Sequence, residues 1–315
     1  MIAGCMVAGA ALFVALNGNA NDMVPPERAP TATQTGSPAT PLELVGIHNV
    51  FRLGRKIYSG SCPEGEAGFR SLAQKGVKTV ISVDGARPDE KAVRKYGMRY
   101  VHIPVNYNGI SREQALSIAR AVRDLPGPVF IHCHHGKHRG PAAAVLAAMV
   151  NEGWTNDDAQ AAMKQAGTSP HYTGLWKAAR EFKKPTSEEM EKADATFPVA
   201  APVPATAAAM VNIDLRWEHI GDIRAANWST PANHPDIVPE HEALLLREDF
   251  RELQRAPDAA KWPADYMKKM AEAENAAEAL ENALRGRNPD KAQAAYKALN
   301  ESCKSCHAVY RDVQY

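Results

Sequence analysis

The chain has 315 residues, 45% of them hydrophobic and 23% charged, so it is long enough for two domains with buried cores. Its 37 Lys and Arg residues nearly balance its 36 Asp and Glu residues, which gives a formal net charge of +1 at pH 7. Such a balance leaves no basic footprint and argues against nucleic acid as a partner.

The first 45 residues predict an export leader and a tether. Residues 1–16 form an uncharged apolar run, and the Gly-Asn-Ala that follows suits a signal peptidase, so residues 1–20 are predicted to be a signal peptide. Ile2-Ala3-Gly4-Cys5 resembles a lipoprotein box, so a lipid on Cys5 is one alternative, and an uncleaved anchor is another. Residues 21–45 are rich in Pro, Thr, Ser and Ala and predict a disordered tether. We expect an exported, periplasmic protein, either free or attached to the membrane through its N-terminus.

Short apolar runs alternate with helical patterns across residues 46–184. This alternation predicts a three-layer α/β domain, in which helices cover both faces of a sheet. The strands are expected at 50–53, 58–63, 76–83, 100–105 and 127–131, and the helices at 64–75, 88–96, 111–124, 141–149, 155–166 and 171–182.

Residues 132–139, with the sequence His-Cys-His-His-Gly-Lys-His-Arg, join a predicted strand to a predicted helix. A helix start presents unpaired N–H groups and a positive dipole end, which together bind phosphate. Gly136 permits a tight curl, and Arg139 can hold two phosphate oxygens at once. The helix start and Arg139 also favour the ionised thiol that Cys133 needs for attack.

The other side chains of this loop add charge or could hold a metal. The predicted phosphate-binding set is His134, His135, Gly136, Lys137, His138 and Arg139, in which the cations would suit a multiply charged substrate. A metal held by the histidines is the alternative, although neighbouring side chains diverge and the usual zinc spacings are absent.

This loop and the strands before it resemble the cysteine phosphatase superfamily, specifically the small atypical dual-specificity phosphatases, some of which act on inositol polyphosphates or pyrophosphates. The resemblance covers about residues 46–184. It implies that Cys133 is the nucleophile that forms a phosphocysteine, that Arg139 clamps the phosphate oxygens and that His132 orders the loop. The implied substrate is a phosphorylated small molecule or protein.

The chain departs from the family pattern at two positions. The family usually places an Asp general acid where this chain has Asn108, and an amide cannot donate that proton. Asp84 is the best substitute, because catalytic groups gather at the carboxyl ends of strands. The family also usually has Ser or Thr where this chain has Gly140, so a slow second step is expected.

Cysteine counting raises a redox hypothesis. With two cysteines assigned to a haem below and Cys5 in the leader, Cys62 and Cys133 remain. A reversible disulfide between them would switch the nucleophile off, and a buried, unreactive Cys62 is the alternative.

A charged and then Ala- and Pro-rich linker, residues 185–203, leads to a second domain at 204–315. Apolar residues there recur at alternating spacings of three and four, which is the seam of packed helices. Four such segments predict an all-α, antiparallel four-helix bundle. The seam positions are 210, 213, 217, 220; 243, 246, 250, 253; 266, 270, 273, 277, 280, 284; and 292, 296, 299, 303, 306, 310.

Cys303-Lys304-Ser305-Cys306-His307 is the attachment pattern of c-type haem. A zinc ribbon would need a second ligand pair, and a thioredoxin-like pair would open a βαβ unit. On a bundle of this length, the motif resembles cytochrome c′. That resemblance implies covalent haem c on Cys303 and Cys306, with His307 as the proximal iron ligand.

The ligand on the other side of the iron decides what the haem does. An empty position suits a diatomic gas, whereas a thioether suits electron transfer with a redox partner, and Met210 on the first seam is the candidate ligand. The favoured function is an exported phosphatase joined to a haem bundle that senses redox state or gas. The alternative is a haem electron carrier whose first domain binds phosphate but turns it over weakly.

Overall fold

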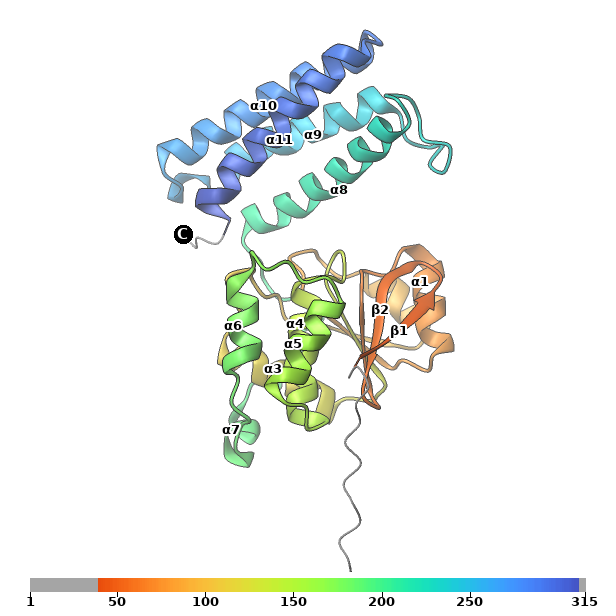
Figure 1. Ribbon diagram of the computed structural model, residues 1–315, viewed down its shortest axis with the longest axis vertical. Helices are drawn as coiled ribbons and strands as arrows, with labels where there is room; N and C mark the ends of the chain where they lie inside the picture. Colours follow the sequence, from red (N-terminus) through yellow and green to blue (C-terminus); the bar gives the residue numbers. More distant parts are fainter. Residues whose placement is uncertain (1–38, 312–315) are drawn as a thin grey trace, which may run out of the picture. The chain divides into compact units, whose positions relative to one another are not determined.

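The computed structural model describes residues 39–311 (Figure 1). The first part of this range contains a mixed sheet of six strands. They are β1 (Ala39–Leu44), β2 (Ile47–Leu53), β3 (Ile57–Gly60), β4 (Thr79–Ser82), β5 (Arg99–His102) and β6 (Val129–His132). The spatial order is β1-β2-β3-β6-β4-β5; β2 is antiparallel to both of its neighbours, and β3, β6, β4 and β5 run parallel.

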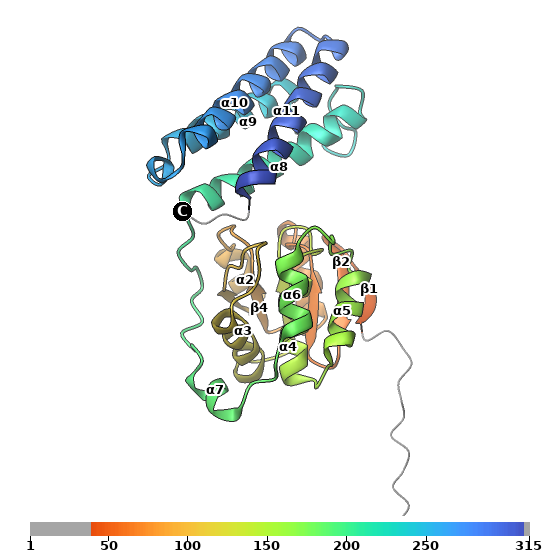
Figure 2. The same cartoon turned by 60° about the vertical axis from the view of Figure 1, so that its left-hand side comes forward.

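Helices cover both faces of this sheet, which makes the predicted three layers (Figures 1 and 2). Along β6, Val129 and Ile131 belong to one core and Phe130 to the other, because side chains alternate across a strand. One face carries α1 (Gly65–Gln74) and α2 (Glu90–Lys95); the other carries α3 (Arg112–Asp124), α4 (Arg139–Asn151), α5 (Asn156–Gln165) and α6 (Thr173–Glu181). Each strand and helix predicted within residues 46–184 is confirmed.

The parallel strands fix the location of the candidate site. β3, β4, β5 and β6 end at the same edge of the sheet, since parallel strands point the same way. The loop 132–139 leaves β6 at this edge and leads directly into α4. The residues that follow β3, β4 and β5 therefore surround that loop.

The predicted tether boundary is wrong. Residues 39–44, assigned to the disordered tether 21–45, form β1 and pair with β2. Leu42 and Leu44 pack against the α1 side of the core, and Pro41 is tolerated because β1 lies at the edge of the sheet. The composition of the segment concealed this two-residue apolar alternation.

The predicted linker 185–203 is also more structured than expected. It contains α7 (Ser187–Lys192), which begins with a capping box between the side chains and backbone of Thr186 and Glu189. The side chain of Met190 is buried against α3. A charged sequence therefore still docks through one apolar residue.

The second half of this linker covers the outer strand of the sheet. The backbone N–H of His102 in β5 donates to the carbonyl of Pro198 at 2.7 Å, and the N–H of Ala201 hydrogen-bonds His102 Nδ1 at 3.0 Å. Phe197 is buried in the core beside α3 and α4. Covering β5 in this way removes an exposed sheet edge, which is otherwise prone to pairing with other chains.

Residues 205–310 form four helices with their own core. They are α8 (Ala205–Ala225), α9 (Pro239–Arg255), α10 (Ala264–Arg285) and α11 (Pro289–Tyr310), with the 3₁₀ turn η1 (Ala259–Lys261) before α10. All of the predicted seam positions pack in this core. The Asn288 side chain caps α11 by accepting from the N–H of Lys291, as its place before Pro289 predicts.

Within residues 39–311, no helix combines the length and apolar character needed to cross a membrane. The predicted signal peptide, anchor and Cys5 lipid site lie outside the described residues.

Candidate functional site

The loop 132–139 is held by a close approach of two backbone segments. Gly136 has a φ of +67°, and a Cβ there would lie 2.3 Å from backbone atoms of Gly60 and Ser61 after β3. Only glycine fits such a gap and such a torsion. The predicted tight curl is therefore pinned against the neighbouring strand end.

Asn49 in β2 connects the same loop to the helical layer, a contact that the sequence alone does not predict. Its side-chain amide donates to the carbonyls of Gly136 and Ala166, both at 2.9 Å. Its backbone φ of 52° is one that asparagine tolerates better than most residues. Nothing in the local sequence pairs Asn49 with residues 87 and 117 positions away, although an Asn inside an apolar strand was a visible anomaly.

A second tie comes from the segment before α6. The hydroxyl of Thr168 donates to the carbonyl of Lys137 at 2.7 Å, and the N–H of Ser169 donates to Nδ1 of His138 at 3.3 Å. Because both sides of the loop are fixed, its N–H groups are held in place before any ligand arrives.

Cys133 and Arg139 are both buried at this site. Cys133 is 2% exposed and directly follows β6, while Arg139 is 9% exposed and is the first residue of α4. The Nη2 atom of Arg139 lies 3.3 Å from Oδ1 of Asp84. The buried Nε atom of Arg139 has no hydrogen-bond partner in the described chain, so it keeps a donor available for an anion.

Asp84 does not fit its predicted role as proton donor. Burial opposes ionisation of its carboxyl group, but Arg139 and the N–H of Ala86 outweigh burial and lower the pKa of Asp84 below its ordinary value. A carboxylate that stays ionised at neutral pH has no proton to give. Asp84 instead orients the Arg139 guanidinium.

His132 is fixed beneath the loop. Its Nε2 atom hydrogen-bonds the Tyr100 hydroxyl at 2.5 Å, and its ring stacks on Phe130. Burial lowers the pKa of His132 to about 4, so the ring is neutral near pH 7. This arrangement suits the predicted role in ordering the loop.

His138 does not supply the expected positive charge. Burial, with its cationic neighbours, lowers the pKa of His138 to about 4. The ring packs beside Tyr107 and Tyr172, whose own rings stack at 4.5 Å. The guanidinium of Arg139 lies 4.4 Å from the centre of the Tyr107 ring, a cation–π contact that the sequence analysis also missed.

The remaining predicted loop residues lie nearer the surface. Lys137 is exposed, and His134 and His135 are half-buried with their rings edge to face at 4.5 Å. The N–H of Cys62 donates to the His134 carbonyl at 2.9 Å, so the Cys62 segment borders the loop. Cys62 and Cys133 are both free thiols here, and burial raises the pKa of Cys62 to about 12. The disulfide between them stays a hypothesis.

The two departures from the family pattern lie in different surroundings. Asn108 lies on the loop after β5, and its carbonyl packs so closely on α6 that a Cβ on Gly174 would be 1.7 Å away. A Cβ on Gly140 would lie 3.1 Å from the Cys133 nitrogen and 3.4 Å from its sulfur. A hydroxyl that could assist the sulfur is therefore missing from the position beside it.

The haem motif lies on the last two turns of α11. Cys306 is buried and Cys303 is half-buried, and both pack in the bundle core with Met210 of α8. Trp217 of α8 stacks on Tyr296 of α11 at 4.6 Å. Met210 lies seven residues before Trp217 on α8, and Cys303 lies seven residues after Tyr296 on α11. Because the two helices run antiparallel, Met210 and Cys303 are at the same level of the bundle.

His307 is on the exposed side of α11, one residue after Cys306. The donor set of two thiols on the core seam, an adjacent imidazole and a thioether across the bundle fits a covalently attached haem. The assignment of each residue to the haem stays a prediction.

Two parts of the chain match known families. Residues 53–153 match the family described as "Polymorphic toxin system, DSP-PTPase phosphatase", and residues 253–311 match cytochrome C′. The first match includes the loop 132–139, and the second includes the haem motif. The chain thus combines a region that resembles dual-specificity phosphatases with one that resembles cytochrome c′.

The similar individual proteins include a dual-specificity phosphatase. Dual specificity protein phosphatase TpbA from two strains of Pseudomonas aeruginosa is 26% and 27% identical over 142 and 143 residues, or 43% and 44% of this chain. The chain spans 64% and 63% of those proteins' length. Two crystal structures of TpbA, one of them in complex with pTyr, are 22% and 21% identical and each cover 48% of this chain and 94% and 100% of their own, with TM-scores of 0.41 and 0.37.

Replacing Asn49 with glycine should weaken phosphate binding. The change keeps the backbone torsion but removes two hydrogen bonds, each worth about 1 kcal/mol, that hold the loop 132–139. We expect the Kd for inorganic phosphate, measured by calorimetry, to rise about threefold to tenfold. Asn227→Gly, at an exposed asparagine that also has positive φ, is the control. An unchanged Kd for Asn49→Gly would show that the amide does not support the loop.

Proposed function

We propose that residues 39–184 hydrolyse phosphate monoesters through a phosphocysteine on Cys133. The observation that carries this proposal is the buried pair of Cys133 and Arg139 at a helix start, where the Arg139 Nε atom has no hydrogen-bond partner within residues 39–311. A buried cation with a free donor beside a thiol is arranged to receive an anion. The similarity to dual-specificity phosphatases supports the same reaction.

In the first step, the ionised Cys133 sulfur attacks phosphorus and the bond to the leaving oxygen breaks. The loop N–H groups and Arg139 hold the three other oxygens while charge shifts to the leaving group. Asp84 keeps the guanidinium in place throughout. In the second step, water attacks phosphorus, the sulfur leaves as thiolate, and a proton is released with the phosphate.

The missing acid selects the leaving group. Asp84 is ionised and Asn108 is an amide, so neither protonates the leaving oxygen. A phenol oxygen leaves more easily than an alcohol oxygen without this help, since tyrosine has a pKa of only about 10. We therefore infer a phosphotyrosine-type substrate in preference to an inositol polyphosphate, whose leaving oxygens are alcohols.

We further propose that the bundle carries haem c on Cys303 and Cys306, with His307 on the iron. The match to cytochrome C′ and the position of both thiols on the core seam support this assignment. Such a haem would supply electron transfer or gas binding, and Met210, which packs against the same core as Cys303, would be the thioether available to its iron. Covalent haem loading and the apolar leader together favour export to the periplasm. The alternative, a haem electron carrier with a weak phosphate-binding domain, is favoured by Asn108 and Gly140.

The phosphatase proposal is tested with haem-loaded protein and two substrates. We expect phosphate release from a phosphotyrosine peptide to exceed release from inositol hexakisphosphate, and to fall at least about a thousandfold in Cys133→Ser. Inorganic phosphate should still bind the variant, because the loop N–H groups and Arg139 remain. Equal background rates for the two proteins would favour the electron-carrier alternative.

The role of Asp84 is tested by the pH profile of Asp84→Asn. If Asp84 only positions Arg139, kcat/KM should fall by roughly 10- to 100-fold at every pH from 5 to 8. A displaced Arg139 guanidinium reduces the reaction rate by about that factor. Since the pKa of Asp84 is lowered in the folded protein, its carboxylate is charged over this whole range. The pH profile of kcat/KM should therefore keep its shape in the variant. Asp89→Asn, in the same loop, serves as control. Loss of a basic limb only in Asp84→Asn would restore Asp84 as the acid.

The haem assignment predicts that Cys303→Ser combined with Cys306→Ser abolishes covalent haem. Protein made in cells that mature c-type cytochromes should then show no haem stain on a denaturing gel, because no thioether bonds form. Cys62→Ser is the matched control and should keep its stain. Separately, Met210→Ala should change the iron from low to high spin only if the thioether binds it.

A further inference from the structure

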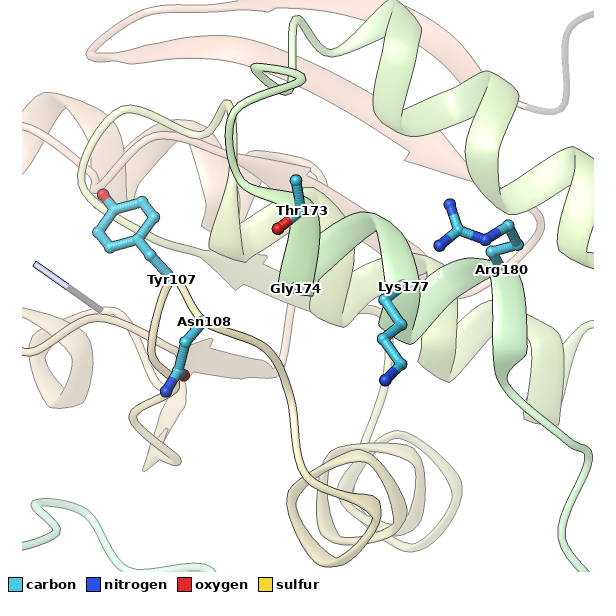
Figure 3. A pocket seen from close by; sticks show the side chains of 6 residues that line it. All are labelled: Tyr107, Asn108, Thr173, Gly174, Lys177 and Arg180. Atoms are coloured by element: carbon cyan, nitrogen blue, oxygen red, sulfur yellow. The ribbon is translucent and has the colours of Figure 1, made fainter. Parts of the chain in front are cut away.

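A groove of about 370 Å³ lies beside the phosphate loop, and the proposed reaction leaves it without a role (Figure 3). It runs between the loop after β5 and helix α6. Tyr107 and Asn108 lie on one side of it, and Thr173, Gly174, Lys177 and Arg180 of α6 line the other.

The Tyr107 ring connects the groove to Arg139, the residue proposed to hold the phosphate. Tyr107 lines the groove, and its ring also contacts the guanidinium of Arg139 at 4.4 Å from the ring centre. A substrate whose phosphate binds Arg139 therefore passes Tyr107 before it can enter the groove.

The walls of the groove are fixed relative to the phosphate loop. The carbonyl of Asn108 packs directly on Gly174, where a Cβ would lie 1.7 Å away. The hydroxyl of Thr168, just before α6, holds the carbonyl of Lys137 at 2.7 Å. The groove is thus formed without a ligand, which reduces the entropy cost of binding one.

The groove carries positive charge that the protein does not neutralise. Lys177 is exposed and makes no ion pair within residues 39–311. Arg180 has only Glu181, 3.8 Å away, and the two side chains are 54% and 56% exposed. Exposed pairs of this kind contribute little, so both cations remain available to an acidic ligand.

The spacing of the cations favours an extended ligand. Lys177 and Arg180 follow Thr173 by four and seven residues, which places them about 6 and 10 Å along α6. An extended peptide advances about 3.3 Å per residue, so a segment of two to three residues would span the stretch of α6 from Thr173 to Lys177 or Arg180. A second hollow of about 250 Å³ shares Thr173 and Arg180 and adds the Trp176 ring for an apolar side chain.

We propose that this groove binds acidic residues that flank the phosphorylated residue of a protein substrate, with Lys177 and Arg180 as its specificity-determining residues. The proposal rests on the phosphatase function proposed above. It narrows the substrate from phosphate monoesters in general to phosphorylated, acidic polypeptide segments.

The test compares three substrates on haem-loaded, full-length protein: a phosphotyrosine peptide with flanking Glu residues, the same peptide with Gln, and a small aryl phosphate. In Lys177→Gln combined with Arg180→Gln, kcat/KM for the Glu peptide should fall about fivefold to tenfold. The loss should fade at high salt. The Gln peptide and the aryl phosphate should change less than twofold, and Lys164→Gln on α5 should change none of them.

Equal losses for all three substrates, or no loss for the Glu peptide, would overturn the groove. A larger loss of kcat/KM for inositol hexakisphosphate than for the Glu peptide would also contradict the proposal, because Lys177 and Arg180 would then bind a compact polyphosphate. Binding of the two peptides to Cys133→Ser, measured by fluorescence anisotropy, separates this proposal from the phosphatase proposal. If no substrate is hydrolysed, the groove stands only when the Glu peptide binds more tightly than the Gln peptide and loses that advantage in the double variant.

Discussion

The phosphate loop depends on the contact between Gly136 and the backbone that follows β3. A Cβ would come within 2.3 Å of that backbone, so the contact leaves no room for any other residue. The chain there also has positive φ, and the loop leads directly into the first turn of α4, where helix N–H groups lack intrahelical partners. Asn49 and Thr168 then hold the two sides of the loop. A binding site made of backbone needs such supports, since it has few side chains of its own.

Burial of Arg139 imposes a second constraint. A guanidinium removed from water needs compensation, and here it has a carboxylate, an aromatic face and the site reserved for an anion. Asp84 supplies the compensation and loses its proton in doing so. The same interaction that keeps the clamp in place therefore excludes Asp84 from proton transfer. The catalytic weakness expected at Asn108 is not repaired by its neighbour.

Local patterns predicted the parts of the structure that depend on local sequence. The strand-loop-helix around Cys133 follows from an apolar run, a glycine and a proline in the first helical turn. The bundle core follows from spacings of three and four, because that repeat places residues on one helix face. These patterns need no knowledge of distant partners.

The contacts that the sequence does not predict at Asn49 and Asp84 involve partners far apart in the chain. Asn49 reaches Gly136 across 87 positions, and Asp84 finds Arg139 across 55. β1 and α7 are ordered by single strips of apolar contact in segments whose composition resembles a linker. The predicted positive charge of His138 is wrong because burial, which the sequence does not display, lowers the pKa of this side chain.

The proposed export would place the Cys133 thiol in an oxidising compartment. Burial in the fold would limit its contact with oxidants. Cys133 is 2% exposed, so a substrate and an oxidant would approach its sulfur through the same small exposed surface. Thiolate character, which makes the sulfur reactive, also makes it vulnerable to oxidation. A bound anion would cover that exposed surface of Cys133, and the cationic groove beside Tyr107 would hold an acidic segment close to the anion. Reactivity toward phosphate and protection from oxidation therefore depend on the same few residues around Arg139.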